Sequence, residues 1–236
     1  MKLSIIIPVF NEEATVKNII EKVLEIKIPS TIYEVIVVDD GSTDKTFSEI
    51  KKIKNKNLKI IKFTKNKGKG AAVRKGIIEA IGEYIIIQDA DLEYDPKDIV
   101  RLFKPIEKGL AKVVYGTRLK RMPNFRRDER TFRFMLHYAG NKSLSLLTSI
   151  LYMHWVSDIE CCYKLFPKKA IYGMSLKARG FEFEPEITAK LLKRGYKILE
   201  ISISTEPRTY NEGKKLNTFD DGFKALWTLL KYRIID

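Results

Sequence analysis

The chain has 236 residues, 44% of them hydrophobic, which is enough to bury the core of a single α/β domain. Its formal net charge of +14 favours polyanionic partners: nucleic acid, an anionic membrane surface or phosphorylated substrates. No apolar run approaches the ~20 residues that cross a bilayer, and the opening apolar stretch is too short for a signal peptide, so we expect a cytoplasmic protein. The adjacent Cys161 and Cys162 suit neither a disulfide framework nor a zinc site.

Strands and helices alternate through the first half of the chain. The predicted strands cover residues 3–9, 33–38, 58–63 and a run from Tyr84, and the predicted helices follow Asn11, Asp44, Arg74 and Pro96. Asn11 is expected to cap the first helix, with Glu12 and Glu13 in its first turn. This alternation predicts a mostly parallel sheet with helices on both faces, whose ligands bind at the carboxyl ends of the strands.

The run from Tyr84 ends in an acidic cluster. In an extended segment Asp89 and Asp91 point the same way, with Glu93 next in the same register. A divalent cation relieves the repulsion between such carboxylates, and oxygen ligands suit Mg²⁺ or Mn²⁺. The alternative is a solvated acidic turn before the helix at Pro96.

Two other turns lie at the same predicted edge of the sheet. Either Asp39 or Asp40 is expected to hold the base or ribose of a nucleotide, unless the pair forms only a turn with a helix cap. The glycines around Lys69 lack the spacing of known phosphate loops, so we expect a sharp turn into the helix, with Lys69 or Arg74 near the nucleotide.

Together these motifs resemble glycosyltransferase family 2. The matching segments, in the family's order and spacing, are 5–12, 37–44, 66–70 and 89–91. The resemblance covers about residues 2–118 and implies a GT-A fold, a nucleotide-sugar donor and a divalent metal. It implies that Pro8, Phe10 and Glu12 line the nucleotide, that Asp39 or Asp40 holds the base, that Asp89, Ala90 and Asp91 carry metal and diphosphate, and that Glu93 is a third metal ligand.

The second half of the chain must supply the acceptor site. A strand is expected at 113–118, and a dense set of cations follows from Arg118 to Arg133, where a guanidinium can grip a phosphate unless the segment is a solvated loop. A helical pattern that Arg130 and Arg133 begin then runs through Ile150, another helix ends near Arg194, and an outer strand covers 197–204. Segment 157–166 resembles a segment of the polyprenyl-phosphate sugar synthases, with Cys162 in place of the usual glycine. Segment 207–215, with Arg208 and Lys214, resembles their basic loop over the donor phosphates.

An anionic acceptor changes the chemistry that the enzyme needs. A sugar hydroxyl needs a general base, whereas a phosphate oxygen is already anionic at pH 7. We therefore expect Asp91 and Arg133 to act electrostatically, and Asp158, where relatives place a base, to orient the acceptor or to serve as a structural carboxylate.

The resulting prediction is an inverting, metal-dependent transferase that moves a hexose from GDP-mannose to a dolichyl or undecaprenyl phosphate. UDP-glucose is the alternative donor, and a glycan hydroxyl the alternative acceptor. A binding protein with a degenerate GT-A domain is the non-enzyme alternative, and no nucleic acid is expected as partner of the enzyme. We expect a catalytic domain at 1–216, with a nucleotide-sugar half at 1–118 and an acceptor half at 119–216.

The tail 217–236 is expected to form an amphipathic helix with a basic face. It either packs on the core or lies in a membrane interface, with Trp227 at headgroup depth. A polyprenyl lipid stays in the bilayer, so the expected location is peripheral, at the cytoplasmic face of the membrane.

Overall fold

The computed structural model describes residues 1–29, 31–118, 132–206 and 218–235, and of residues 132–134 and 218–219 it describes the backbone alone. The strands are β1 (Lys2–Val9), β2 (Ile32–Asp39), β3 (Leu58–Lys62), β4 (Tyr84–Ile87), β5 (Val113–Thr117), β6 (Lys164–Pro167) and β7 (Ile198–Ser202). The helices are α1 (Val16–Glu25), α2 (Thr46–Lys52), α3 (Lys69–Glu79), α4 (Lys97–Glu107), α5 (Phe132–Tyr152), α6 (Phe183–Lys193) and α7 (Thr218–Ile234), with a 3₁₀ turn at Lys168–Ile171.

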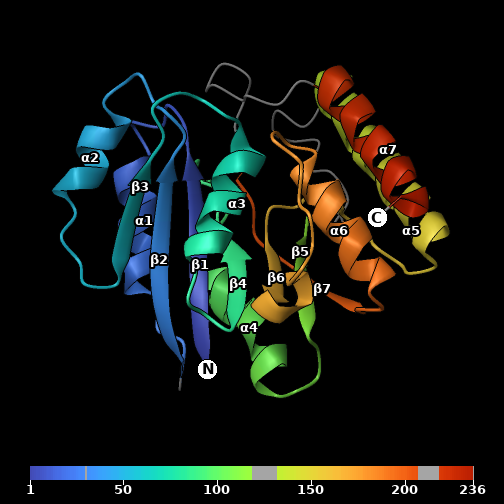
Figure 1. Cartoon of the computed structure of the whole chain (residues 1–236), viewed down its shortest axis with the longest axis horizontal. Helices are drawn as coiled ribbons and strands as arrows, with labels where there is room; N and C mark the ends of the chain where they lie inside the picture. The colour runs from blue at the N-terminus through green and yellow to red at the C-terminus, as the bar shows by residue number, and fades with distance from the viewer. Residues whose placement is uncertain (30, 119–131, 207–217, 236) are drawn as a thin grey trace.

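The strands form one sheet in the order β3-β2-β1-β4-β6-β5-β7 (Figure 1). Every pairing is parallel except those of β6, which runs antiparallel to both β4 and β5. The mostly parallel α/β architecture is therefore confirmed, and the outer strand expected at 197–204 is the edge strand β7. Strand β6 was not predicted, because its four residues pair with strands that are distant in sequence.

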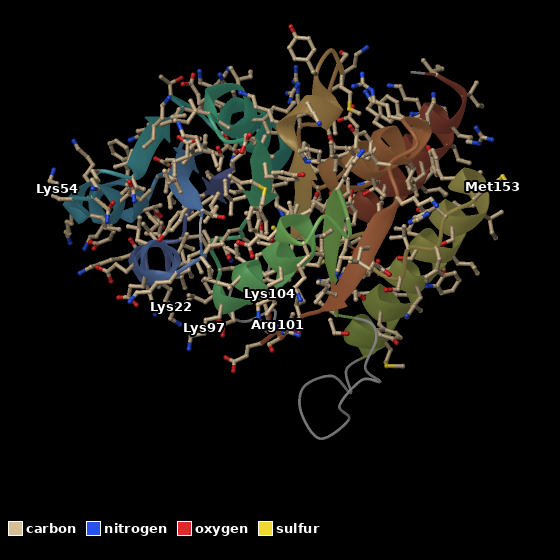
Figure 2. The ribbon with its side chains drawn as sticks, turned by 90° about the horizontal axis from the view of Figure 1, so that it is seen from below. Lys22, Lys54, Lys97, Arg101, Lys104 and Met153 are labelled. Atoms are coloured by element: carbon tan, nitrogen blue, oxygen red, sulfur yellow. The ribbon has the colours of Figure 1, made fainter. Side chains whose placement is uncertain are left out.

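Helices cover both faces of the sheet. Helices α3 and α6 lie on one face and α1 and α4 on the other (Figures 1 and 2). The apolar stripe of α1 is buried, whereas Lys22 of α1 and Lys97 and Lys104 of α4 project outward (Figure 2). The central strands are buried on both faces, which explains their almost uninterrupted Ile and Val content.

The expected cap of the first helix was wrong. Helix α1 begins at Val16, after a turn in which the Glu12 carbonyl accepts the backbone N–H of Thr15 and of Val16. Asn11 instead has φ of 50°, and its side-chain oxygen accepts the N–H of Thr43 at 2.9 Å. This contact joins the loop after β1 to the loop after β2, so Asn11 positions two loops at the carboxyl edge of the sheet.

The C-terminal helix α7 packs against both α5 and α6. The Tyr152 hydroxyl at the end of α5 donates to the Leu229 carbonyl at 2.8 Å. Within the described ranges no helix is both long enough and apolar enough to cross a membrane.

Candidate active site

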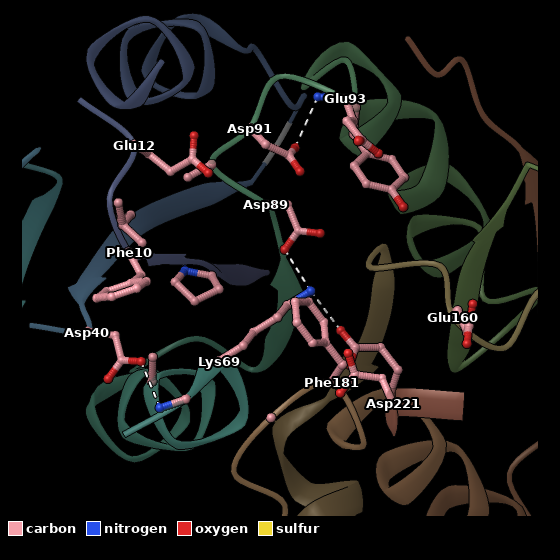
Figure 3. Close-up of a pocket in the computed structure, with 18 of the residues that line it drawn as sticks. Phe10, Glu12, Asp40, Lys69, Asp89, Asp91, Glu93, Glu160, Phe181 and Asp221 are labelled. Carbon is pink, nitrogen blue, oxygen red and sulfur yellow. Dashed lines mark hydrogen bonds and ion pairs between the residues drawn. The ribbon is translucent and has the colours of Figure 1, made fainter. Parts of the chain in front are cut away.

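A cavity of about 370 Å³ lies at the carboxyl ends of β1, β2 and β4, between the two halves of the chain (Figure 3). Most of the residues predicted to form the site line it: Pro8, Phe10, Glu12, Asp40, Lys69, Asp89, Ala90, Asp91, Glu93 and Arg118. The sequence separates these residues widely, and the strand order brings them together. Asp39 and Arg74 are not among its lining residues.

The two adjacent aspartates after β2 have different partners. Asp40 accepts the backbone N–H groups of Lys67 and Gly68, both at 2.8 Å, and burial raises its pKa. Asp39 is fully buried, and its Oδ1 accepts the N–H of Ser42 at 3.0 Å. Asp40 thus lies at the cavity wall and Asp39 behind it, and which of them contacts a base stays a prediction.

The glycines beside Lys69 allow two backbones to approach closely. Gly68 has φ of +95°, and a Cβ there would lie 2.2 Å from the carbonyl oxygen of Arg179. The N–H of Ala71 donates to the same carbonyl at 3.2 Å. The turn therefore docks α3 onto the loop before α6. Arg74 donates to the Leu176 carbonyl at 2.7 Å in the same region, so its predicted place near the nucleotide stays untested.

The acidic segment after β4 turns instead of continuing the strand. Leu92 has φ of 63°, and Oδ1 of Asp91 accepts the N–H of Glu93 at 3.1 Å. Asp89 and Asp91 both line the cavity, but the described residues contain no assembled group of three His, Cys, Asp or Glu side chains. The two carboxylates fit a hard divalent cation as its first ligands, since Mg²⁺ commonly takes one or two carboxylates plus substrate phosphates.

A partly buried lysine bridges two carboxylates at the centre of the cavity (Figure 3). Nζ of Lys69 lies 2.8 Å from Oδ1 of Asp89 and 2.9 Å from Oε1 of Glu184. Burial alone would lower the pKa of Lys69, but the two carboxylates outweigh it and hold the pKa well above its ordinary value. Glu184 was missed from the sequence, where it is one of three acids in an ordinary helix start.

Arg118, whose side chain is 22% exposed, forms an ion pair with the fully buried Asp158 at the other end of the cavity. Nε and Nη2 of Arg118 each donate to Asp158 at 2.8 Å, its backbone N–H donates at 2.9 Å, and Nδ2 of Asn141 donates at 2.8 Å. Burial would raise the pKa of Asp158, but Arg118 and these hydrogen bonds lower it to about 2. Asp158 is fully buried and does not line the cavity, whereas Arg118 does. The carboxylate therefore holds the guanidinium in place.

The second half of the chain also contributes cavity residues that the sequence did not indicate. His137 of α5 and Glu160 line the cavity, with Nε2 of His137 3.6 Å from Oε2 of Glu160, and Asp221 and Ala225 bring α7 into the wall. No local motif marks them, because the packing of α5 and α7 against the rest of the fold puts them there. Arg208 and Lys214 lie outside the described residues, as does the side chain of Arg133.

A mostly parallel sheet with an acidic pair after its fourth strand, facing a cavity between the two halves of the chain, is the arrangement of the GT-A class of sugar transferases. The family model described as glycosyl transferase family 2 matches residues 4–172. The chain belongs to that family and is a glycosyltransferase, so the fold and family expected from the motifs are confirmed.

Three relatives carry different sugars in their names. The chain is 28% identical over 247 residues to the dolichyl-phosphate beta-glucosyltransferase of Dictyostelium discoideum, covering 98% of this chain and 73% of that one. It is 28% identical to the dolichol-phosphate mannosyltransferase of Pyrococcus furiosus, with 98% and 64% covered. It is 29% identical to the UDP-N-acetylglucosamine–dolichyl-phosphate N-acetylglucosaminyltransferase of Methanococcus voltae, with 98% and 95% covered.

Among solved structures, the fold resembles glucosyl-3-phosphoglycerate synthase from Mycobacterium tuberculosis, crystallised with Mn²⁺, uridine diphosphate and phosphoglyceric acid. The TM-score is 0.73 at 19% identity, covering 100% of this chain and 79% of that one. At this identity the likeness supports the fold alone.

Proposed function

We propose that this glycosyltransferase moves a hexose from a nucleotide sugar to a polyprenyl phosphate, with inversion at the anomeric carbon. The proposal is supported by the cavity, which has the acidic pair Asp89 and Asp91 and the guanidinium of Arg118 in its wall. The names of the three relatives support the acceptor class, because all contain dolichyl or dolichol phosphate. They leave the transferred sugar open among mannose, glucose and N-acetylglucosamine.

The chemistry of Asp158 favours a phosphate acceptor over a hydroxyl. A general base works best with a pKa near the operating pH. Asp158 has a pKa of about 2 and accepts four hydrogen bonds from Arg118 and Asn141, so it is a poor proton acceptor. A phosphate oxygen needs no base, and Arg118, held in place by Asp158, supplies the charge that attracts it.

The donor half performs the complementary task. Pro8 and Phe10 line the nucleotide end, and Asp40 fixes the turn before Lys69. Asp89 and Asp91 would hold a Mg²⁺ or Mn²⁺ ion, which supplies charge stabilisation to the departing diphosphate. Holding donor and acceptor phosphates in one cavity replaces a bimolecular encounter by an oriented one.

The lipid acceptor requires contact with a bilayer, and the outer surface of α5 and α7 fits that contact. Exposed apolar side chains recur at helical spacing on α5 and continue just beyond its end: Leu146, Ile150, Met153 and Trp155. The same spacing recurs on α7: Phe223, Trp227, Leu230 and Ile234. Met153 projects from the end of α5 (Figure 2). Lys224 and Arg233 are exposed on α7, so we infer that this surface docks on an anionic membrane.

The test is a donor panel followed by a transfer assay. Thermal unfolding is measured with GDP-mannose, UDP-glucose and UDP-N-acetylglucosamine, each with and without Mn²⁺, because a ligand that binds the folded state raises its stability. The stabilising donor is then incubated with a short-chain polyprenyl phosphate and, separately, with the corresponding polyprenol. A lipid-phosphate sugar formed from the phosphate alone supports the proposal, and transfer to the polyprenol or to neither lipid contradicts it.

A further inference from the structure

Glu184 lies in the first turn of α6, with its side chain 4% exposed at the wall of the cavity. Its Oε1 lies 2.9 Å from Nζ of Lys69. Neither carboxylate oxygen accepts a hydrogen bond of good geometry from the part of the chain that the structure describes. A buried carboxylate in this state is costly, because its desolvation is not repaid by hydrogen bonds.

The neighbouring acid on the same helix shows what a satisfied carboxylate looks like here. Glu186 accepts the backbone N–H groups of Lys177 and Ala178 and pairs with Lys190 at 3.2 Å. Both carboxylate oxygens of Glu186 therefore have partners within the fold. Among the described residues, Glu184 has one ion-pair partner within 4.0 Å, Lys69, and Asp89 pairs with the same ammonium group.

The position of Glu184 within the cavity indicates which ligand supplies the missing donors. In Figure 3, Phe10 and Asp40 lie on one side of Lys69 and Glu160 lies on the other. The hexose of a nucleotide sugar is attached to the phosphate farther from the nucleoside. If that phosphate lies at Asp89 and Asp91, the hexose lies beside Lys69 and Glu184.

We propose that Glu184 accepts a hydrogen bond from a hydroxyl of the donor hexose, and that Lys69 fixes its carboxylate for that contact. The inference rests on the proposed function and adds a sugar-binding residue to it. Hydroxyl groups are the donors that hexoses offer, and a bond to an ionised carboxylate is among the stronger hydrogen bonds in proteins.

The test separates sugar binding from nucleotide binding. Calorimetry with Mn²⁺ measures the dissociation constant of the preferred nucleotide sugar and of its nucleoside diphosphate, for the wild type and for Glu184→Gln. We expect Glu184→Gln to weaken the nucleotide sugar roughly 10- to 100-fold and the nucleoside diphosphate by less than about 2-fold. Glu186→Gln is the matched control: it removes an acid of the same helix that is bonded within the fold, and it should lower thermal stability without changing the ratio of the two constants.

A second series leaves the protein unchanged. Deoxy analogues of the donor, each lacking one hexose hydroxyl, are measured with the wild type, and one of them should bind at least about 10-fold more weakly. With Glu184→Gln that analogue and the complete donor should bind alike.

Three results would overturn the inference: equal weakening of sugar and diphosphate by Glu184→Gln, no weakening of either, or no sensitive deoxy analogue. If the substituted protein does not fold, the deoxy series on the wild type decides alone. If the wild type binds neither donor nor diphosphate, the proposed function fails and the inference fails with it.

Discussion

The replacement Asp158→Asn tests whether the buried carboxylate orients Arg118 or acts as a base. The lowered pKa, from 3.8 to about 2, corresponds to about 2–3 kcal/mol of stabilisation at pH 7. The asparagine would also point its own N–H group at the donors of Arg118 and Asn141. The free energy of unfolding should therefore fall by about 3–5 kcal/mol in total, as when one partner of a buried ion pair is removed.

The pH dependence has a definite sign. The folded-state pKa of Asp158 lies below its unfolded value, so its contribution is present at and above about pH 4 and is lost as the pH falls toward 2. In urea unfolding, the difference in the free energy of unfolding between the wild type and Asp158→Asn should therefore be smaller at pH 3 than at pH 7. A suitable control is Asp98→Asn, because Asp98 pairs with an Arg101 side chain that is 50% exposed, and its loss should be smaller.

Activity distinguishes the two roles of Asp158. An orienting carboxylate predicts that Asp158→Asn weakens acceptor binding along with stability, with no new group in the pH profile of turnover. Wild-type stability combined with a loss of turnover of about 10³-fold or more would instead identify a general base and refute the assignment.

Three further substitutions follow from the structure. Asp91→Asn should abolish transfer and Mn²⁺-dependent donor binding. The control is Asp95→Asn, which should leave both intact because Asp95 is exposed and lies outside the cavity lining. Retained transfer in Asp91→Asn would exclude the carboxylate pair as the metal site. Trp227→Ser should weaken sedimentation with anionic vesicles by about 10-fold, and unchanged binding would place the membrane contact elsewhere. Gly68→Ala should lower the free energy of unfolding by about 2–4 kcal/mol, because its Cβ would meet a backbone carbonyl at 2.2 Å. Gly109→Ala, with φ of +67° and no atom within 4 Å, should lose about 1 kcal/mol, and equal losses would contradict the close-approach argument.

The donor half of the site was predictable because its signals are local. Apolar runs that end in polar turns indicate strands, and the parallel alternation then places Asp40, Asp89 and Asp91 at one edge. The order of the motifs identified the family without any knowledge of side-chain contacts.

The part of the site formed by Arg118 and the residues after it was less predictable because its contacts are long-range. Arg118 and Asp158 were both singled out, yet their pairing across 40 positions left no local trace. Glu184 and His137 reach the cavity through the packing of α6 and α5, which no periodicity reveals. Asn11 was assigned to its own helix because a capping pattern describes neighbours in sequence, whereas its partner Thr43 lies in another loop.

The antiparallel strand β6 has a consequence for how the molecule is assembled during synthesis. Strand β5 meets the sheet only through β6 and β7, both of which follow it in the chain. Strands β1 to β4 can pair as they leave the ribosome, whereas β5 must wait until residues 164–167 have been made. The strands that precede Asp40 and Asp89 can thus pair early, whereas the strand that precedes Arg118 has no neighbour in the sheet until β6 is made. The pairing of residues 164–167 with both β4 and β5 therefore joins the early part of the sheet to its last two strands.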